Sequence, residues 1–440
     1  MTEIHFTVTA AFDRSFFWKR GSSVRYLVAR LNARSEDNPC KDGRAPLNVA
    51  LAIDASGSMG GGKLAAAKSA ALGFAERLTE RDRLTVVSFA SDVRVHLDAV
   101  PVTAENAMRI RAEISRLQTR DTTFLSGGWF AGVDCTARVA EEDPGMSPRV
   151  IILSDGHANN GITDAAELGE HAEELRMRGV LTSALGIGDG YDEQLLRSIA
   201  EHGGGRLHDA EMVDEISLVL LGELDDIFET VVEDAQIKLT APKGVKVEVL
   251  GKGYARVANG GALVFIGPVQ NRVEQFAVFK VTCPKARRGD ELKFELAVDG
   301  SAASDRLISK SDAATIRLTA ANGTANGSQP RDGEIAEIAA RIWSADIVAN
   351  AARMNRDHAF EKAETYVKRE LRYFRRYVEG LDHEREMIQE IELLSRRVGD
   401  LLSSRMHKEM TFQSSLEIQE RIDHRGSDKV SWSRRMERGD

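Results

Sequence analysis

The sequence is poor in cysteine and lacks a long apolar run. Its three cysteines, Cys40, Cys135 and Cys283, lie far apart and are odd in number, which suits neither a disulfide framework nor a zinc site. No apolar stretch reaches the roughly 18 residues that cross a bilayer. The first residues alternate apolar and polar side chains, unlike a secretory signal. These absences predict a soluble protein in the reducing cytoplasm.

An excess of positive charge is also missing. The 440 residues include 59 Lys and Arg against 68 Asp and Glu, for a formal net charge of -9. This balance does not favour attraction to nucleic acid or to an anionic membrane, so we expect neither as a partner. Hydrophobic residues make up 42% of the chain, which is enough to bury a core, and the length predicts three domains.

Residues 46–225 alternate short apolar runs with amphipathic helical stretches. This pattern is typical of parallel strands joined by right-handed crossovers. Four runs are apolar on both faces and are expected as buried strands, namely Leu47–Ile53, Leu84–Ala90, Val150–Ser154 and Val180–Ile187. Helical periodicity occurs at Lys63–Leu78, Glu105–Leu117, Leu125–Ala140, Asp164–Arg178 and Asp192–Glu201. We therefore predict a doubly wound, Rossmann-like α/β domain.

The regions on either side of this block have a period of two instead. Residues 1–45 contain two candidate strands with alternating apolar and polar side chains. Residues 226–319 contain about six more, separated by the turns PKG, NGG and RRGD. These strands are too many for one isolated ribbon. We expect an antiparallel β-sandwich into which the α/β domain is inserted.

The remainder of the chain changes character twice more. Residues 320–333 are polar and predict a linker. Residues 334–405 carry apolar side chains at spacings of three and four, which predicts an α-helical hairpin or bundle and a candidate surface for self-association. Its basic and aromatic run, Lys368–Tyr377, continues an apolar stripe and is interpreted as an ordinary solvated helix. Residues 406–440 are polar, and a disordered tail is the prediction there.

Five polar residues follow strands or open a helix at the expected carboxyl edge of the parallel sheet. Asp54, Ser56 and Ser58 come directly after the first strand. Thr123 precedes a helix, and Asp155 ends another strand. Ligands bind at this edge in open α/β sheets, so three loops are predicted to converge on one site.

The groups that this site offers are all hard oxygens, which favours Mg²⁺, with Mn²⁺ or Ca²⁺ as alternatives. Asp54 and Asp155 only just balance the charge of a dication, and Mg²⁺ retains waters where the protein supplies few ligands. A coordination position is therefore left for an incoming group. We expect an Asp or Glu side chain of another protein to take it.

These residues resemble the metal-ion-dependent adhesion site of the von Willebrand factor A (VWA) family, Asp-x-Ser-x-Ser followed by a distant Thr and a distant Asp. The resemblance covers residues 46–225 and extends through the stretches LTVVSF and RVIILSDGHANNG. It implies that Ser56 and Ser58 hold the metal directly, that Thr123 does so in one state, and that Asp54 and Asp155 act largely through water.

Two features qualify the resemblance. The stretch DTTFL stands where many relatives have two glycines before the Thr. The flanking strands and the following helices are similar to soluble bacterial members and to inter-alpha-trypsin inhibitor heavy chains.

Two other interpretations account for fewer of these residues. Gly57–Lys63 fits the spacing of a phosphate-binding P-loop, but Leu64 stands where a Ser or Thr would hold Mg²⁺, and that reading leaves Asp54 and Thr123 without a role. Capping of the following helix by Asp54 and the serines would explain only one of the three loops.

An open metal site could also activate water, which makes a magnesium-dependent hydrolase an alternative function. His157 lies close to Asp155 in sequence, but no Ser-His-Asp or Cys-His arrangement can be placed around it. Met59, His157 and Asn159 are interpreted instead as rim residues that contact the partner. The predicted function is a non-enzymatic adaptor, and a regulatory subunit of an ATPase, kinase or phosphatase system is the further alternative.

Overall fold

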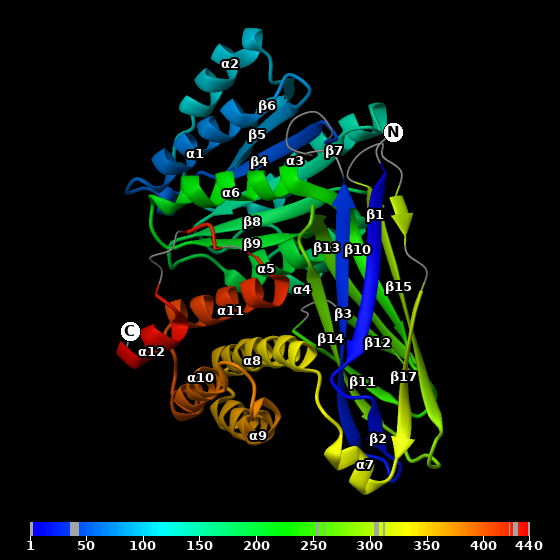
Figure 1. Ribbon diagram of the computed structural model, residues 1–440. Coiled ribbons are helices and arrows are strands. Elements are labelled where there is room, and N and C mark those ends of the chain that lie inside the picture. The colour runs from blue at the N-terminus through cyan, green and yellow to red at the C-terminus, as the bar shows by residue number, and fades with distance from the viewer. Residues whose placement is uncertain are drawn as a thin grey trace.

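The structure is a computed structural model that describes residues 3–35, 44–251, 255–258, 260–302, 308–310, 313–421, 423–425 and 430–438. Cys40 and most of the loop before the α/β domain lie outside the described residues, whereas Cys135 and Cys283 are buried free thiols. The described elements form three sheets and a group of C-terminal helices (Figure 1). None of the described helices is both long and apolar enough to cross a membrane.

The central α/β domain is built on one six-stranded sheet in the order β6-β5-β4-β7-β8-β9. Its strands are β4 (Leu47–Asp54), β5 (Arg83–Phe89), β6 (Val93–Pro101), β7 (Ser147–Ser154), β8 (Leu181–Ile187) and β9 (Gly204–Ala210). All neighbours pair in parallel except β5 and β6. The predicted doubly wound α/β fold is confirmed, and β6 and β9 are additions at its two edges.

Helices cover both faces of this sheet, and β4 shows why. Val49 and Leu51 belong to one apolar core, while Ala50 and Ala52 belong to the core on the opposite face. Each face is therefore apolar, as a buried parallel strand requires. The helices of the domain are α1 (Lys63–Arg77), α2 (Ala104–Ser115), α3 (Leu125–Glu142), α4 (Ala165–Met177), α5 (Glu193–His202) and α6 (Glu215–Glu229).

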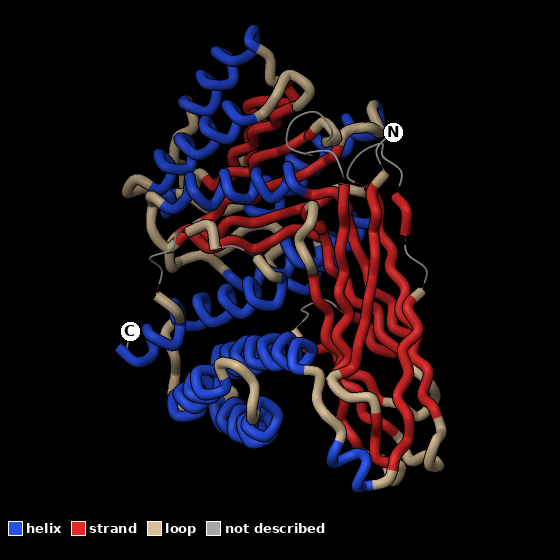
Figure 2. Tube along the Cα trace, in the orientation of Figure 1, coloured by secondary structure: helices blue, strands red, loops and turns tan. Residues whose placement is uncertain are grey.

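Two further sheets are made from strands that precede and follow this domain in sequence. The five-stranded sheet has the order β11-β14-β3-β1-β16, and the six-stranded one has the order β12-β13-β10-β15-β17-β2. Their long strands form the strand-rich side of the molecule in Figure 2, and the two sheets enclose one apolar core, to which Leu27 of β3 and Ile237 of β10 both contribute. Helix α6 ends at Glu229 and β10 begins at the next residue, Thr230.

The bounds of these strands follow the turns in the sequence. They are β1 (Ile4–Phe12), β2 (Phe16–Trp18), β3 (Ser23–Ser35), β10 (Thr230–Thr240), β11 (Lys246–Leu250), β12 (Ala255–Ala258), β13 (Gly261–Gln270), β14 (Gln275–Cys283), β15 (Glu291–Ala302), β16 (Ile308–Lys310) and β17 (Ala314–Ala321). Most neighbours are antiparallel, and the short edge strands β16 and β2 pair in parallel.

The C-terminal helices share a core with the outer face of the five-stranded sheet. Trp343 and Phe374 pack there with Tyr26 and Phe276 of that sheet. The helices are α7 (Gly323–Ser328), α8 (Gly333–Arg356), α9 (Phe360–Val378), α10 (Glu384–Arg397), α11 (Ser404–Gln419) and α12 (Trp432–Arg438). Helix α7 falls inside the predicted linker, where the side chain of Asn322 accepts a hydrogen bond from Ala325 and caps it.

Helix α11 occupies the segment for which the sequence predicts a disordered tail. It lies between the α/β domain and α8 (Figure 1). Its charged residues Lys408 and Glu409 are buried, at 3% and 0% exposure. Composition alone indicates a solvated segment, because it cannot show that partners far away in sequence neutralise these charges.

A buried ion network attaches α11 to the α/β domain. Arg425 donates to both carboxylate oxygens of Glu409, at 2.9 and 3.0 Å, and to Asp209 at the end of β9, at 3.0 Å. Arg405 reaches Asp209 and Glu409 as well. Burial alone would raise the pKa of Glu409, but the hydrogen bonds and charges of Arg425 and Arg405 outweigh it and lower that pKa to about 2.

Replacement of Glu409 tests this network. Glu409→Gln leaves two buried guanidinium groups short of a counter-charge, so the free energy of unfolding at pH 7 should fall by about 3 kcal/mol. The contribution of Glu409 is complete above its unfolded pKa of about 4.3 and is lost as the pH falls toward its folded pKa of about 2. Urea denaturation should therefore show the difference from the unmodified protein shrinking between those two pH values.

The exposed Glu361 on α9 provides the matched control. Glu361→Gln should leave the free energy of unfolding within about 0.5 kcal/mol of the unmodified protein. Equal stability of both variants at pH 7 would show that α11 does not depend on this network.

Candidate metal centre

The structure brings the five predicted site residues together at the carboxyl edge of the central sheet. Asp54 is the last residue of β4, and Asp155 directly follows β7. These two strands are parallel neighbours, so their ends lie side by side. Thr123 precedes α3, and a short 3-10 helix, Gly57–Met59, carries Ser58.

Hydrogen bonds link most of these oxygens. The Ser56 and Ser58 hydroxyls are 2.9 Å apart, and the Ser58 hydroxyl donates to Asp155 Oδ1 at 2.7 Å. The other carboxylate, Asp54, accepts from the Ser56 amide at 2.8 Å and from the Ser154 hydroxyl at 2.6 Å. Ser154 was not singled out by the sequence, although it immediately precedes Asp155. It holds Asp54 in one orientation.

Gly156 shows that space is available beside the oxygens. A Cβ added there would lie 3.5 Å from Ser58 Oγ, 3.6 Å from Thr123 Oγ1 and 3.9 Å from Asp54 Oδ2. Oxygens from two loops thus surround one position on the third loop that glycine leaves open. Four of the five site residues are at most 4% exposed, and Ser58 is the exposed one.

The donor set fits a small hard dication. It consists of two carboxylates and three hydroxyls, the oxygen ligands that Mg²⁺ and related ions prefer. Within the described ranges, no group of three or more His, Cys, Asp and Glu residues is arranged to hold a metal. A site of this kind therefore depends on its hydroxyl groups. Burial raises the pKa of Asp54, and the hydrogen bonds from Ser154 and Ser56 counteract that rise.

Asn159 holds the Thr123 loop. Its side-chain oxygen accepts a hydrogen bond from the backbone N–H of Thr123 at 2.9 Å. Its backbone N–H donates to the Thr123 carbonyl at 3.2 Å. The carbonyl of Asp121 accepts from the Gly57 amide at 3.0 Å, which joins this loop to the first one. The stretch DTTFL, which lacks the two glycines of many relatives, therefore forms a loop that is held by hydrogen bonds to its backbone.

The three predicted rim residues have different environments. Met59 is fully buried in the core beneath the site, so its proposed contact with a partner is wrong. It is apolar and lies on the inward side of the short 3-10 helix. Asn159 is exposed, but its side-chain oxygen and backbone N–H are used on Thr123. The His157 side chain is 72% exposed, with Nδ1 3.6 Å from Asp192, and its partner contact stays a prediction.

Lys63 is an electrostatic participant that sequence reasoning assigned only to the rejected P-loop. Its ammonium group is 2.5 Å from Asp155 Oδ2. A positive charge therefore already lies against one of the two site carboxylates. Because Lys63 occupies the first turn of α1, five residues after Ser58, a signal for this contact existed in the motif itself.

The C-terminal helix α11 reaches a loop beside the metal centre. Lys408 donates to the carbonyl of Asp189, and its ammonium lies 3.7 Å from the centre of the Tyr191 ring. Between these two residues, a Cβ on Gly190 would be 3.0 Å from the Asp155 carbonyl oxygen. The loop is therefore packed between α11 and a predicted metal ligand.

The fold defines an open α/β domain with a cluster of oxygen-bearing side chains at the carboxyl edge of its sheet. Residues 48–219 match the family model of the von Willebrand factor type A domain. The chain therefore contains a VWA domain, as predicted from the sequence, and the role of its five site residues in metal binding stays a prediction.

Curated relatives match this domain and part of its surroundings. An uncharacterized protein of Synechocystis is 32% identical over 187 residues, 42% of each chain. The uncharacterized protein YfbK of Escherichia coli is 27% identical over 279 residues, 60% of this chain and 45% of the relative. The inter-alpha-trypsin inhibitor heavy chain H3 of Rattus norvegicus is 24% identical over 231 residues, 52% and 26%. The chain spans less than half the length of these relatives.

Two solved structures share the fold over nearly the whole chain. A von Willebrand factor type A protein from Catenulispora acidiphila has a TM-score of 0.64 at 17% identity and covers 88% of each chain. The ArnB paralog VWA2 from Sulfolobus acidocaldarius has a TM-score of 0.58 at 15% identity, covering 93% of this chain and 99% of the other. The likeness extends beyond the VWA domain to the elements around it.

Removal of the Lys63 charge should strengthen metal binding. A cation that enters the site is repelled by this ammonium group, which costs roughly 1 kcal/mol even at the dielectric of bulk water. Lys63→Met should therefore raise the Mg²⁺ affinity about fivefold at low ionic strength, measured by calorimetric titration, and the gain should shrink in salt. Lys68→Met, further along α1, serves as the control. A weaker affinity in Lys63→Met would mean that the lysine supports the site.

Filling the space at Gly156 should have the opposite effect. In Gly156→Ala the new methyl group makes no contact shorter than 3.5 Å, so the fold should persist. It lies beside the oxygens of Asp54, Ser58 and Thr123, and we expect Mg²⁺ binding to weaken about tenfold. Gly73→Ala on α1, whose Cβ meets only Leu221 at 3.9 Å, is the matched control. Unchanged affinity in Gly156→Ala would place the metal elsewhere.

Proposed function

We propose that this protein is a metal-dependent adaptor that binds an Asp or Glu side chain of a partner protein. VWA domains generally mediate metal-dependent protein–protein interaction. The observation that carries the proposal is the meeting of Ser58, Thr123 and Asp54 oxygens around the space over Gly156, with only two carboxylates in the site.

Each site residue has a role in this proposal. Ser56 and Ser58 hold the ion directly, Thr123 holds it in one state of its loop, and Asp54 and Asp155 orient bound water. Mg²⁺ is the proposed ion, with Mn²⁺ or Ca²⁺ as alternatives. When bound, the ion supplies a positive centre that an incoming carboxylate can approach.

The surface beside the site suits a protein partner. The loop after β9 lies at the same edge of the sheet, because β9 runs parallel to β8. It exposes Met212 and Val213, at 57% and 39%. Apolar side chains next to a polar anchor are typical of the centre and surroundings of protein interfaces. The partner would therefore present an acidic residue flanked by apolar ones.

A magnesium-dependent hydrolase is the alternative function, together with a regulatory subunit of an ATPase, kinase or phosphatase. A hydrolase needs a base that is held near the attacking water. His157 is the candidate, yet its side chain is largely exposed, and its Nδ1 lies 3.6 Å from a carboxylate oxygen of Asp192. This favours the adaptor. A cytoplasmic location and self-association through the C-terminal helices stay predictions.

Metal removal tests the adaptor. Partners captured on the immobilised protein in Mg²⁺ should be released by EDTA and should be absent from Asp54→Ala, which retains the fold. Glu142→Gln, an exposed charge change at the end of α3, should capture them normally. Substitution of the acidic residue in the captured partner by its amide should weaken binding at least tenfold. Capture that survives both EDTA and Asp54→Ala would rule out the metal edge as the binding surface.

A parallel activity screen separates the enzyme alternative. Phosphatase and ATPase substrates should give no turnover that depends on Mg²⁺. Turnover that is present in the unmodified protein and lost in Asp54→Ala would identify a hydrolase instead.

A further inference from the structure

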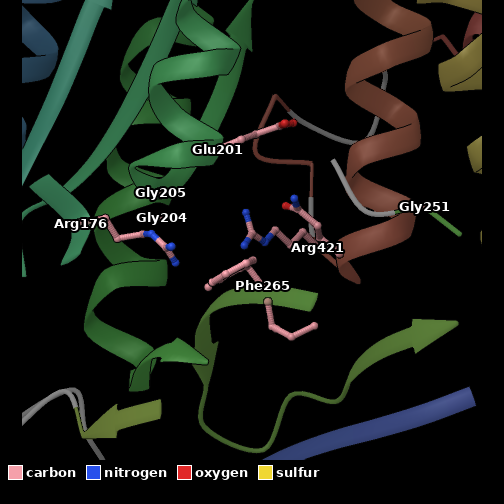
Figure 3. Close-up of a pocket in the computed structure, with 10 residues that line it drawn as sticks. Arg176, Glu201, Gly204, Gly205, Gly251, Phe265 and Arg421 are labelled. Atoms are coloured by element: carbon pink, nitrogen blue, oxygen red, sulfur yellow. The ribbon is translucent and has the colours of Figure 1, made fainter. Parts of the chain in front are cut away.

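A polar pocket lies where three parts of the molecule meet (Figure 3). They are the VWA domain, the six-stranded sheet that contains β13, and the C-terminal segment, which is α11 with the residues that follow it. This junction pocket is lined by Arg176 and Glu201 of the VWA domain, Phe265 of β13, Gln419 and Arg421 of the C-terminal segment, and several glycines. One of these glycines, Gly204, begins β9, whereas the metal centre lies where the parallel strands end. The pocket and the metal centre are therefore at opposite edges of the sheet.

Two guanidinium groups point toward each other in this pocket. Figure 3 shows Arg176 and Arg421 entering from opposite sides, with Phe265 below them. Arg176 is fixed by an ion pair with Asp234, and its guanidinium carbon lies 4.6 Å from the centre of the Phe265 ring. The two like charges come from separate parts of the chain, so the folded structure brings them together.

Arg421 lacks an acid of its own among the described residues. Its Nε is buried without a hydrogen-bond partner. The nearby carboxylates are used by others: Glu223 pairs with His208, and Asp226 pairs with Arg206 and His424. Burial, and after it the charge of Arg206, lowers the pKa of Arg421 well below its usual range. A partly buried charge without a paired acid is costly, and an anion would offset that cost.

The backbone directs Arg421 into the pocket. Helix α11 ends at Gln419, and Glu420 adopts a left-handed conformation with φ of 51°. The Arg421 amide then donates back to the Leu416 carbonyl at 3.0 Å. A left-handed backbone is unfavourable for a residue with a side chain, and here it is the turn that sends the arginine toward the VWA domain.

Glycines leave the pocket open. Gly204, Gly251 and Gly267 all have positive φ, which favours glycine over other residues, and none of them fills the pocket with a side chain. The acidic residue in the lining, Glu201, has Arg197 as an ion-pair partner at 3.8 Å. The balance of charge around the opening is therefore positive.

We propose that the junction pocket binds a small oxyanion, a phosphate or carboxylate group, between Arg421 and Arg176. Guanidinium groups match such anions because two parallel N–H donors meet two oxygens. The anion would bridge the VWA domain and the C-terminal segment. Free phosphate and the phosphate group of a small metabolite share this chemistry.

Calorimetric titration of the metal-free protein with orthophosphate, in a buffer low in chloride, tests the site. The unmodified protein should bind saturably. Arg421→Gln should bind at least tenfold more weakly, and Arg421→Lys should lie between the two because it keeps the charge without the paired donors. Glycerol phosphate and succinate, titrated in the same way, distinguish a phosphomonoester and a dicarboxylate from free phosphate.

Two controls separate this site from other effects. Arg109→Gln, an exposed change on α2, should bind phosphate like the unmodified protein. Asp54→Ala should also bind normally, since the metal centre lies at the opposite edge. Saturable binding that Arg421→Gln does not weaken, or no saturable binding by any of the three anions, would overturn the proposal.

Thermal denaturation without anion supplies a readout that a purely structural arginine would not give. If Arg421 awaits an anion, Arg421→Gln should melt at the same temperature as the unmodified protein or higher, because it removes an unpaired charge. Phosphate should raise the melting temperature of the unmodified protein alone. A lower melting temperature of the variant, with no response of either protein to phosphate, would assign Arg421 a structural role and reject the site.

Discussion

The parallel pairing of β4 with β7 is the constraint on which the metal centre depends. It places the last residue of β4, Asp54, beside the residue that follows β7, Asp155. Both strands are buried on two faces, so their register cannot slip without moving apolar side chains out of both cores. The carboxylates are therefore positioned by the packing of the sheet, and the loops have only to add hydroxyl groups.

The sequence was informative wherever the determinants are local. Strands that are apolar on both faces, and the convergence of five polar residues at one edge of the sheet, could be predicted because residue type and spacing suffice for them. The edge strand β9 (GGRLHDA) was missed because its glycines and charges hide it, and its Asp209 is neutralised by Arg405 of α11 and by Arg425. Ser154 acts through a contact that only the folded chain shows, whereas the contact of Lys63 with Asp155 had a signal in its spacing from Ser58. Met59 was misassigned because proximity in sequence does not show which way a side chain points.

Charged side chains have different surroundings at the edge of the central sheet and along α11. At the metal edge, two carboxylates face a space lined by hydroxyls, and one of them already contacts Lys63. Along α11, carboxylates and guanidinium groups are closed into a buried network with Asp209. The same helix, through Lys408, also contacts the loop beside Asp155. The C-terminal segment therefore forms part of the environment of the site, although it follows the VWA domain by almost two hundred residues.

The direct passage from α6 into β10 has a mechanical consequence. A helix that slides by one turn moves about 5.4 Å, whereas a strand repeats about every 3.3 Å. Since Thr230 follows Glu229 without a loop, a one-turn shift of α6 along its axis would move β10 relative to β13 and β15 by more than one residue. The hydrogen bonds of both ladders would resist it in shear. A force that pulls on α6 would therefore be transmitted to β10 and resisted by its hydrogen bonds with β13 and β15.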